Sequence, residues 1–220
     1  MRKATKRKSI FHSGAEGGGR SGVVGGKIAA IMLDRDGVVN RELGRAVRSW
    51  DEFEFLPGVF QAFQQLAMLQ IPVVVLSNQS AIGRGWVSSE TVDAIHREMM
   101  GRIRGAGGRI DDVMVCPHAP ESECSCRKPK PGLLLETAIK HRFDLRWAVM
   151  VGDSHRDIEA AQAANAIPLM VRSGHAIPRK LEERLNRENV RVVADLVSAV
   201  TAIANGSVFP LTGGESRENL

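Results

Sequence analysis

Two aspartates lie close together near the start of the chain, and something must offset the repulsion between their charges. In IMLDRDGVVN, residues 31–40, an apolar run ends at Leu33 and is followed by Asp34 and Asp36. Carboxylates crowded at the end of a buried strand repel each other, because burial strengthens the interaction between like charges. Mg²⁺, a hard cation that binds oxygen ligands, would relieve this repulsion. The stretch therefore predicts a magnesium site.

Polar residues also follow two later apolar runs. Ser77 comes directly after VVVL, and Asp153 comes after WAVMVG. In open parallel sheets, ligands bind outside the carboxyl ends of the strands. A single aspartate at a strand end can simply cap a turn or a helix. Carboxylates and a serine at three such ends instead favour one shared site.

These residue types suit phosphoryl transfer. Asp34 could act as the nucleophile and form an aspartyl-phosphate. Asp36 could protonate the leaving oxygen and later accept a proton from the hydrolytic water. Ser77 and nearby backbone N–H groups would hold the phosphoryl oxygens, and RKPKPG supplies Arg127 and Lys128 as positive charge. The alternative interpretation of this charge run is a solvated surface segment.

All three cysteines lie in one short window together with a histidine. The window contains four soft or borderline ligands, Cys116, His118, Cys124 and Cys126. Four such ligands suit tetrahedral Zn²⁺ and predict a closed, structural zinc loop. A disulfide between Cys124 and Cys126 would be strained, and the clustering favours a reducing compartment. The alternative is a pair of inert thiols beside a surface histidine.

Apolar periodicity predicts the elements that must position these residues. Strands are expected at 27–33, 73–76, 112–116, 147–151, 168–171 and 190–193. Helices are expected at 57–69, 88–104, 132–141, 156–165, 178–186 and 194–204, with Ser88 or Ser89 as the cap of the second. This alternation predicts an α/β fold, with a parallel sheet and helices on both of its faces.

The charge of the chain is unevenly placed. The 220 residues suffice for one domain and carry a formal charge of +5, but residues 1–27 hold seven Lys or Arg against one acidic residue. We expect a disordered basic tail at 1–26, the folded domain at 27–205 and a loose tail at 206–220. Because the excess charge belongs to the tail, we expect no nucleic-acid partner, with tail-driven binding to RNA or a membrane as the alternative.

The lengths of the apolar runs predict where the protein is located. The longest runs, such as 71–76, are far too short to cross a bilayer, and the start of the chain lacks the apolar core of a secretory signal. We therefore expect a cytoplasmic monomer with no membrane partner. An organelle transit peptide is the alternative.

Four segments resemble the four motifs of the haloacid dehalogenase (HAD) superfamily. LDRDGVVN, LSNQS, RKPKPG and VGDSHRD follow one another in the family order between Ile31 and Asp157. The resemblance implies a Rossmann-like sheet and a phosphatase. Short gaps after the first two motifs leave no room for a large cap domain.

The resemblance also implies roles for individual residues. Asp34 would be the nucleophile and Asp36 the general acid and base, with Ser77 and Lys128 stabilising the phosphoryl group. Mg²⁺ would bind Asp34, Asp153 and the main-chain carbonyl of Asp36. A supporting carboxylate, Asp157, completes this set. The contacts expected for the substrate are Asn78, Arg84, Arg127 and Lys128, together with the segment Glu42–Arg45.

The cysteine window followed by RKPKPG resembles the zinc-containing subgroup of this superfamily, which includes heptose-bisphosphate and histidinol-phosphate phosphatases. The segments KPKPG and SNQSAIGRG favour the heptose enzymes. The resemblance implies an Mg²⁺-dependent phosphatase that removes the 7-phosphate of D-glycero-D-manno-heptose 1,7-bisphosphate through an aspartyl-phosphate. The alternatives are histidinol phosphate or another small sugar phosphate as substrate, and a catalytically inactive protein that senses a phosphorylated metabolite.

Overall fold

The computed structural model describes residues 27–208 and is built on one parallel sheet. Six strands follow the order β3-β2-β1-β4-β5-β6, and every neighbouring pair is parallel. The strands are β1 Ala30–Leu33, β2 Val73–Asn78, β3 Asp112–Cys116, β4 Ala148–Gly152, β5 Ile167–Val171 and β6 Arg191–Val193. Because β1 lies between β2 and β4, the residues that follow these three strands meet at one edge of the sheet.

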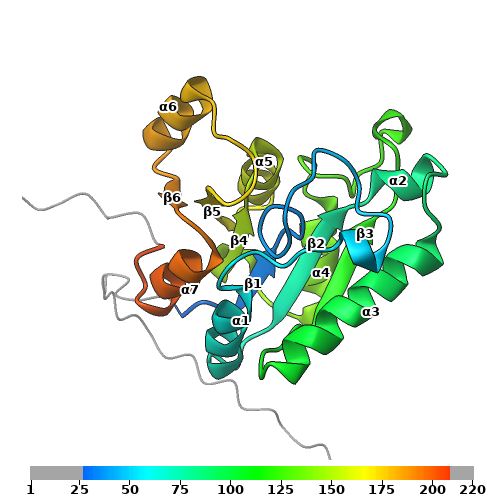
Figure 1. Ribbon diagram of the computed structural model, residues 1–220. Helices are drawn as coiled ribbons and strands as arrows, with labels where there is room; N and C mark the ends of the chain where they lie inside the picture. Colours follow the sequence, from blue (N-terminus) through cyan, green and yellow to red (C-terminus); the bar gives the residue numbers. More distant parts are fainter. Residues whose placement is uncertain (1–26, 209–220) are drawn as a thin grey trace, which may run out of the picture.

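Helices cover both faces of the sheet, as expected (Figure 1). One face carries α1 Val59–Met68, α3 Ser89–Gly105 and α7 Leu196–Ala204. The other carries α4 Gly132–His141 and α5 His155–Ala163, while α6 Arg179–Arg187 packs near β5 and β6. The short helix α2, Ser80–Gly83, follows β2 directly.

The two-sided core follows from side-chain alternation along the strands. Ile31 and Leu33 of β1 belong to the cluster that includes Phe63 of α1 and Met99 of α3. Met32, between them, belongs to the cluster on the opposite face with Leu134 of α4. Strands buried on both faces need continuous apolar runs, which is the pattern that the sequence shows.

The expected strands and helices occur in the expected order, with ends that shift by a few residues. β3 and α4 begin and end at the predicted residues. The strand β2 runs two residues further than predicted, to Asn78. Ser88 is the cap of α3, because its hydroxyl accepts a hydrogen bond from the backbone N–H of Thr91 at 3.1 Å. The helix α2 and three short 3₁₀ helices, η1 Trp50–Glu52, η2 Pro120–Ser122 and η3 Leu145–Trp147, were not predicted.

The described chain has no large cap domain over the sheet edge. The segment between β1 and α1 contains only η1, and α2 alone lies between β2 and α3. Of the predicted C-terminal tail, the structure describes residues 206–208, and Val208 is buried in the same core cluster as α7. The remainder of both predicted tails lies outside the described residues. Among the described helices, none combines the length and the apolar character needed to cross a membrane.

Candidate active site

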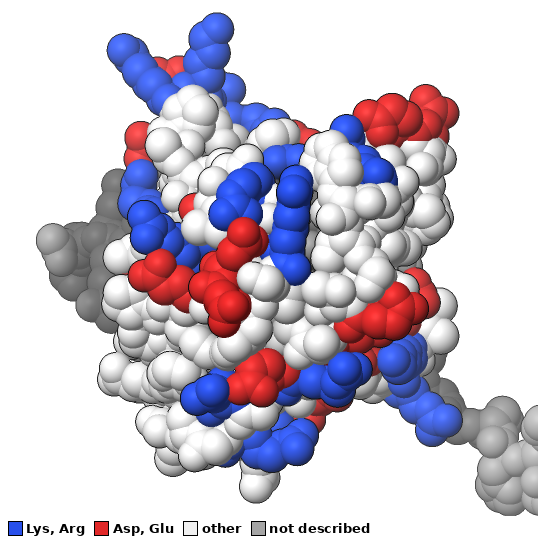
Figure 2. Space-filling model, turned by 45° about the vertical axis from the view of Figure 1, so that its right-hand side comes forward, with Lys and Arg blue, Asp and Glu red and all other residues white. Residues whose placement is uncertain are grey.

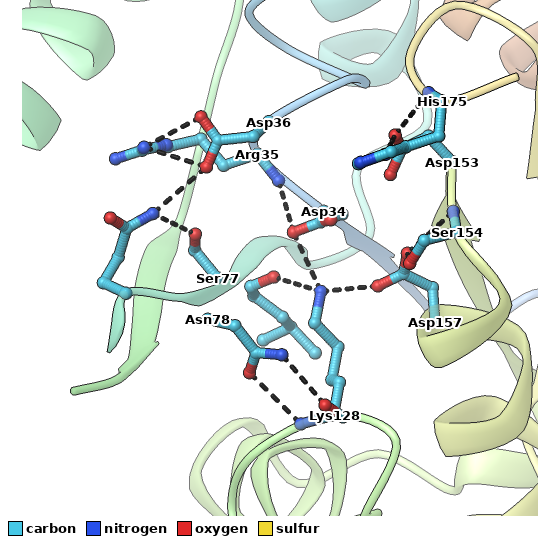
Figure 3. A network of polar contacts seen from close by, with 12 residues as sticks. Asp34, Arg35, Asp36, Ser77, Asn78, Lys128, Asp153, Ser154, Asp157 and His175 are labelled. Atoms are coloured by element: carbon cyan, nitrogen blue, oxygen red, sulfur yellow. Dashed lines mark hydrogen bonds and ion pairs between the residues drawn. The ribbon is translucent and has the colours of Figure 1, made fainter. Parts of the chain in front are cut away.

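A cavity of about 250 Å³ lies beyond the carboxyl ends of β1, β2 and β4. Its walls include the residues predicted from the strand ends and from RKPKPG, namely Asp34, Asp36, Ser77, Arg127, Lys128 and Asp153. The fold thus brings together side chains that are more than a hundred residues apart in the chain. Figure 3 shows them converging around the end of β1.

Three carboxylates form an acidic cluster at this edge. Asp34, Asp153 and Asp157 each offer one oxygen, and these oxygens all lie within 4.8 Å of one another. Burial, and after it the charge of Asp157, raises the pKa of Asp34 to about 8 against the opposing effect of Lys128. A divalent cation would favour the ionised forms of Asp34 and Asp153, whose pKa values are raised. The crowded oxygen donors therefore fit Mg²⁺.

Lys128 is the buried cation of the cluster. Its ammonium group lies 2.8 Å from Asp34 Oδ1 and 2.6 Å from Asp157 Oδ1, and it donates a hydrogen bond to the carbonyl of Leu76 at 2.8 Å. Burial lowers the pKa of Lys128, but the charges of Asp157 and Asp34 outweigh burial and raise it overall. Lys128 therefore acts as a fixed positive charge, because its three N–H bonds have acceptors within hydrogen-bonding distance.

Asp157 and Asn78 hold this arrangement in place. Asp157 Oδ2 accepts hydrogen bonds from the backbone N–H of Ser154 at 3.1 Å and from its hydroxyl at 2.6 Å, at the start of α5. The Asn78 side chain donates to the carbonyl of Lys128 at 3.0 Å and accepts from its N–H at 3.1 Å. Asn78 also lines the cavity, so its predicted contact with the substrate stays a prediction, while these hydrogen bonds hold the backbone of Lys128.

Asp36 lies in a different electrostatic environment from Asp34. One nitrogen of Arg35, Nη2, donates to both Asp36 oxygens at 2.9 Å. Asn40 donates to Oδ1 at 2.9 Å, and Gln79 donates to Oδ2 at 3.1 Å and to Ser77 Oγ at 2.8 Å. Burial raises the pKa of Asp36, but the charge and hydrogen bonds of Arg35, Asn40 and Gln79 lower it overall.

Asp153 is enclosed by backbone as well as by side chains. Its Oδ2 accepts a hydrogen bond from the backbone N–H of His175 at 2.9 Å and lies 2.6 Å from the ring nitrogen Nδ1 of His175. A methyl group at Gly37 or at Gly174 would overlap this same oxygen. Gly37 also has a φ of 82°, which side chains disfavour. Glycine at both positions therefore makes the space that Asp153 occupies.

The cysteine window folds into a compact ligand cluster. The three sulfur atoms of Cys116, Cys124 and Cys126 lie 3.3, 3.5 and 3.6 Å apart, and His118 Nδ1 lies 3.7 and 3.3 Å from the sulfurs of Cys116 and Cys126. In a tetrahedral site with Zn–S bonds of about 2.3 Å, neighbouring sulfurs are about 3.8 Å apart. The separations thus fit zinc, and they are far longer than a disulfide bond.

The predicted substrate contacts divide into two groups. Arg127 and the segment around Glu42 and Arg45 line the cavity. Arg84 is not among the lining residues. It forms an ion pair with Glu121 at 3.1 Å, and its guanidinium lies 5.0 Å from the ring centre of Trp86. This geometry does not favour the predicted phosphate contact.

Sequence reasoning did not find three further residues of the site. Gln79 bridges Asp36 and Ser77, and His175 contacts Asp153. Arg156 lines this cavity together with His175, and both also line an adjoining cavity of about 560 Å³. Gln79 and Arg156 stand inside the segments LSNQS and VGDSHRD, which could have drawn attention to them. No comparable signal surrounds His175.

Comparisons with known proteins agree with this geometry. A family model described as "HAD-hyrolase-like" matches residues 125–199. The D-glycero-beta-D-manno-heptose-1,7-bisphosphate 7-phosphatase of Bordetella bronchiseptica is 39% identical over 168 residues, which cover 76% of this chain and 93% of that protein. The D-glycero-alpha-D-manno-heptose-1,7-bisphosphate 7-phosphatase of Mycobacterium bovis is 41% identical over 133 residues, which cover 60% of this chain and 70% of that protein.

A solved structure supports the same relationship. The D,D-heptose 1,7-bisphosphate phosphatase of B. bronchiseptica, crystallised with magnesium and phosphate, superposes with a TM-score of 0.73 at 36% identity. The match covers 80% of this chain and 98% of that one. The similarity thus extends over most of this chain and almost all of that structure.

Proposed function

Because the chain belongs to the family of HAD-like D-glycero-D-manno-heptose-1,7-bisphosphate 7-phosphatases, we propose that it hydrolyses the 7-phosphate of D-glycero-D-manno-heptose 1,7-bisphosphate. One observation carries the proposal beyond the family. Asp34 and Asp36 line the same cavity as the buried ammonium of Lys128 and the acidic cluster. This cavity combines a nucleophile, a proton carrier and positive charge, which phosphate-ester hydrolysis requires.

In the first step, Asp34 attacks phosphorus. Asp34 Oδ1 accepts hydrogen bonds from the N–H of Arg35 at 2.8 Å and lies 2.8 Å from Lys128 Nζ, so we assign the attack to Oδ2. The new bond joins Oδ2 to phosphorus, and the bond between phosphorus and the C7 oxygen breaks. The product on the enzyme is an aspartyl-phosphate.

Asp36 carries the proton in both halves of the reaction. An arriving phosphate is negatively charged and raises the pKa of a neighbouring carboxyl group, which opposes the lowering by Arg35. Asp36 then protonates the leaving C7 oxygen. As a carboxylate, it accepts a proton from the water that attacks the aspartyl-phosphate, which releases inorganic phosphate and restores Asp34.

Positive charge and hydrogen-bond donors hold the phosphoryl group. Ser77 Oγ accepts from Gln79, which leaves its own hydrogen to be directed into the cavity. We assign Mg²⁺ binding to Asp34, Asp153 and the carbonyl of Asp36, with Asp157 as the supporting carboxylate. When bound, Mg²⁺ supplies charge neutralisation for the phosphoryl group.

We also assign a structural Zn²⁺ to Cys116, His118, Cys124 and Cys126. All four ligand positions are filled by protein atoms, so the metal would stabilise the loop that ends at Arg127 and would take no part in the chemistry. Three reduced thiols need a reducing compartment, which supports a cytoplasmic location.

Arg127 is the proposed contact for the phosphate that is not cleaved. Arg127 lines the cavity, and the hydrogen bond from its guanidinium to the carbonyl of His118 is long, at 3.5 Å. Lys128 and Ser77 serve the transferring phosphoryl group, which leaves the planar fork of Arg127 for a second phosphate. The substrate would therefore be a bisphosphate.

A phosphate-release screen tests the proposal. The substrates are both anomers of the heptose 1,7-bisphosphate, the heptose 7-phosphate, other sugar monophosphates and histidinol phosphate, each with added Mg²⁺. We expect the highest kcat/KM for a heptose 1,7-bisphosphate. A preference for histidinol phosphate would overturn the heptose assignment and leave a phosphatase of this family, whereas the absence of phosphate release from every substrate would overturn the proposed chemistry.

A further inference from the structure

A buried histidine behind the cavity has no part in the mechanism above. His96 lies on α3 with 4% of its surface exposed, and Arg35, on the loop after β1, is fully buried. The distance between His96 Nε2 and Arg35 Nη1 is 3.0 Å. Two polar side chains from distant elements thus meet inside the apolar layer under α3.

The chemistry of this pair fixes the direction of the hydrogen bond. A guanidinium has only donors, so His96 Nε2 must be the acceptor and the ring must be neutral, with its proton on Nδ1. Burial, and after it the charge of Arg35, lowers the pKa of His96 to about 4. The ring therefore remains an acceptor at neutral pH.

The other end of the same guanidinium reaches Asp36. Nη2 donates to both carboxylate oxygens at 2.9 Å, while Asn40 and Gln79 each donate to one of them. Arg35 is planar and rigid, so fixing Nη1 also fixes Nη2. His96 is therefore connected to the Asp36 carboxylate through a single stiff group.

We propose that His96 is a positioning residue for proton transfer to the leaving oxygen, acting through the Arg35 guanidinium on the orientation of Asp36. The inference rests on the proposed function, in which Asp36 is the general acid and base. Without the His96 acceptor, a buried N–H of Arg35 would have lost its partner. The guanidinium would turn toward another acceptor, and the carboxylate that it holds would turn with it.

A purely structural role for His96 predicts a different outcome. His96 lies beside Ile95 and one turn from Met99, both in the core cluster under α3. If His96 only fills this space, its truncation should lower kcat/KM for every substrate by the same factor. If His96 positions the general acid, its truncation should lower kcat/KM only for substrates whose leaving group needs a proton.

The test therefore varies the leaving group. The C7 alkoxide of the heptose bisphosphate must be protonated as it leaves, whereas p-nitrophenolate leaves without a proton. The value of kcat/KM reports steps up to phosphoryl transfer and excludes the later hydrolysis of the aspartyl-phosphate. We expect His96→Ala to lower kcat/KM for the heptose bisphosphate by about 10- to 100-fold and for p-nitrophenyl phosphate by less than about threefold.

Four further variants keep the result interpretable. Asp36→Asn removes the acid itself and should show the same split between the two substrates. His96→Gln returns an acceptor and should recover part of the loss on the heptose bisphosphate. Met99→Ala truncates a core residue of the same helix that forms no hydrogen bond with Arg35 in the described structure, and it should lower the melting temperature without a split. His96→Phe keeps most of the side-chain volume but has no hydrogen-bond acceptor. It replaces His96→Ala in the comparison of the two substrates if His96→Ala does not fold.

The outcomes separate this inference from the function on which it rests. Equal losses on both substrates in His96→Ala or His96→Phe, or no loss on either, would overturn the positioning role. A split in Asp36→Asn without one in the His96 variants would overturn the inference and leave the acid assignment intact. No split in Asp36→Asn would overturn the acid assignment and the inference with it.

Discussion

At the scale of single residues, two aspartates from one loop have opposite surroundings. The pKa of Asp34 is raised to about 8 by burial and by neighbouring carboxylates, whereas that of Asp36 is lowered because Arg35 outweighs burial. Carboxylates whose pKa values are moved apart suit different tasks in one reaction. The crowded carboxylates around Asp34 fit a cation, whereas Asp36 is already paired with the guanidinium of Arg35.

Replacement of Asp34 by asparagine should abolish turnover and leave the fold intact. An amide cannot form the acyl-phosphate, and its volume nearly matches that of the carboxyl group. We expect a fall in kcat of at least about a thousandfold, with a circular dichroism spectrum like that of the wild type. Phosphatase activity within about tenfold of the wild type would show that Asp34 is not the nucleophile.

The binding of Mg²⁺ should depend on pH through Asp34. The pKa of Asp34 is raised from 3.8 to about 8 in the folded state. Its protonated form therefore stabilises the fold fully below pH 4, and this contribution is lost as the pH rises through 8. Mg²⁺ reverses this loss because it binds the ionised form. The melting temperature should therefore rise more on addition of Mg²⁺ at pH 8 than at pH 5. Asp34→Asn is the control, and equal shifts at both pH values in the wild type would contradict the prediction.

Removal of the Arg127 guanidinium should affect the bisphosphate selectively. A bidentate contact with a phosphate is charge-assisted, so Arg127→Ala should lower kcat/KM for the heptose 1,7-bisphosphate by about 10- to 100-fold. The heptose 7-phosphate should lose little, and the two substrates should become nearly equal. Equal losses on both substrates would show that Arg127 only supports the cysteine loop.

At the scale of secondary-structure elements, the sequence located the strands whose ends form the site. Continuous apolar runs predicted β1, β2 and β4, and the polar residues that follow them lie in one cavity. The contacts of His96 and His175 were not predictable, because each joins elements that no local pattern relates. The helix α2 was not predicted, because four residues are too few to show the apolar periodicity of a helix.

The proposed zinc site makes the stability of the cysteine loop depend on metal. The purified protein should carry one tightly bound Zn²⁺, measured by elemental analysis. Cys124→Ala should remove the zinc and lower the melting temperature by about 5 °C or more, because metal binding contributes to folding free energy. Ser125→Ala, in the same loop, is the control and should keep the metal. Wild-type protein that was purified without chelators and contains no zinc would exclude the four-ligand site.

At the scale of the whole molecule, the charges beyond residue 27 nearly cancel. Outside residues 1–27 the chain has 23 basic and 24 acidic residues. Lys and Arg side chains are interspersed with Asp and Glu over the face shown in Figure 2. The net charge of +5 thus comes from the first residues of the chain, and the domain itself has little general attraction for polyanions.

Removal of residues 1–26 should separate polyanion binding from catalysis. The shortened protein should elute from heparin at lower salt than the full chain, because six of its Lys and Arg residues are lost. Its kcat/KM for the heptose bisphosphate should stay within about twofold of that of the full chain. A large loss of activity in the shortened protein would show that these residues take part in the reaction.

The glycines around Asp153 have a consequence for how this gene can change. At Gly37 and at Gly174, any side chain would overlap the carboxylate oxygen of Asp153. Neither glycine has an atom that reacts, yet a missense change at either codon would displace a carboxylate of the acidic cluster. Selection on the acidic cluster would therefore act on these two codons as well, through the space that they leave for Asp153. What is inherited at both positions is the room that the Asp153 carboxylate fills.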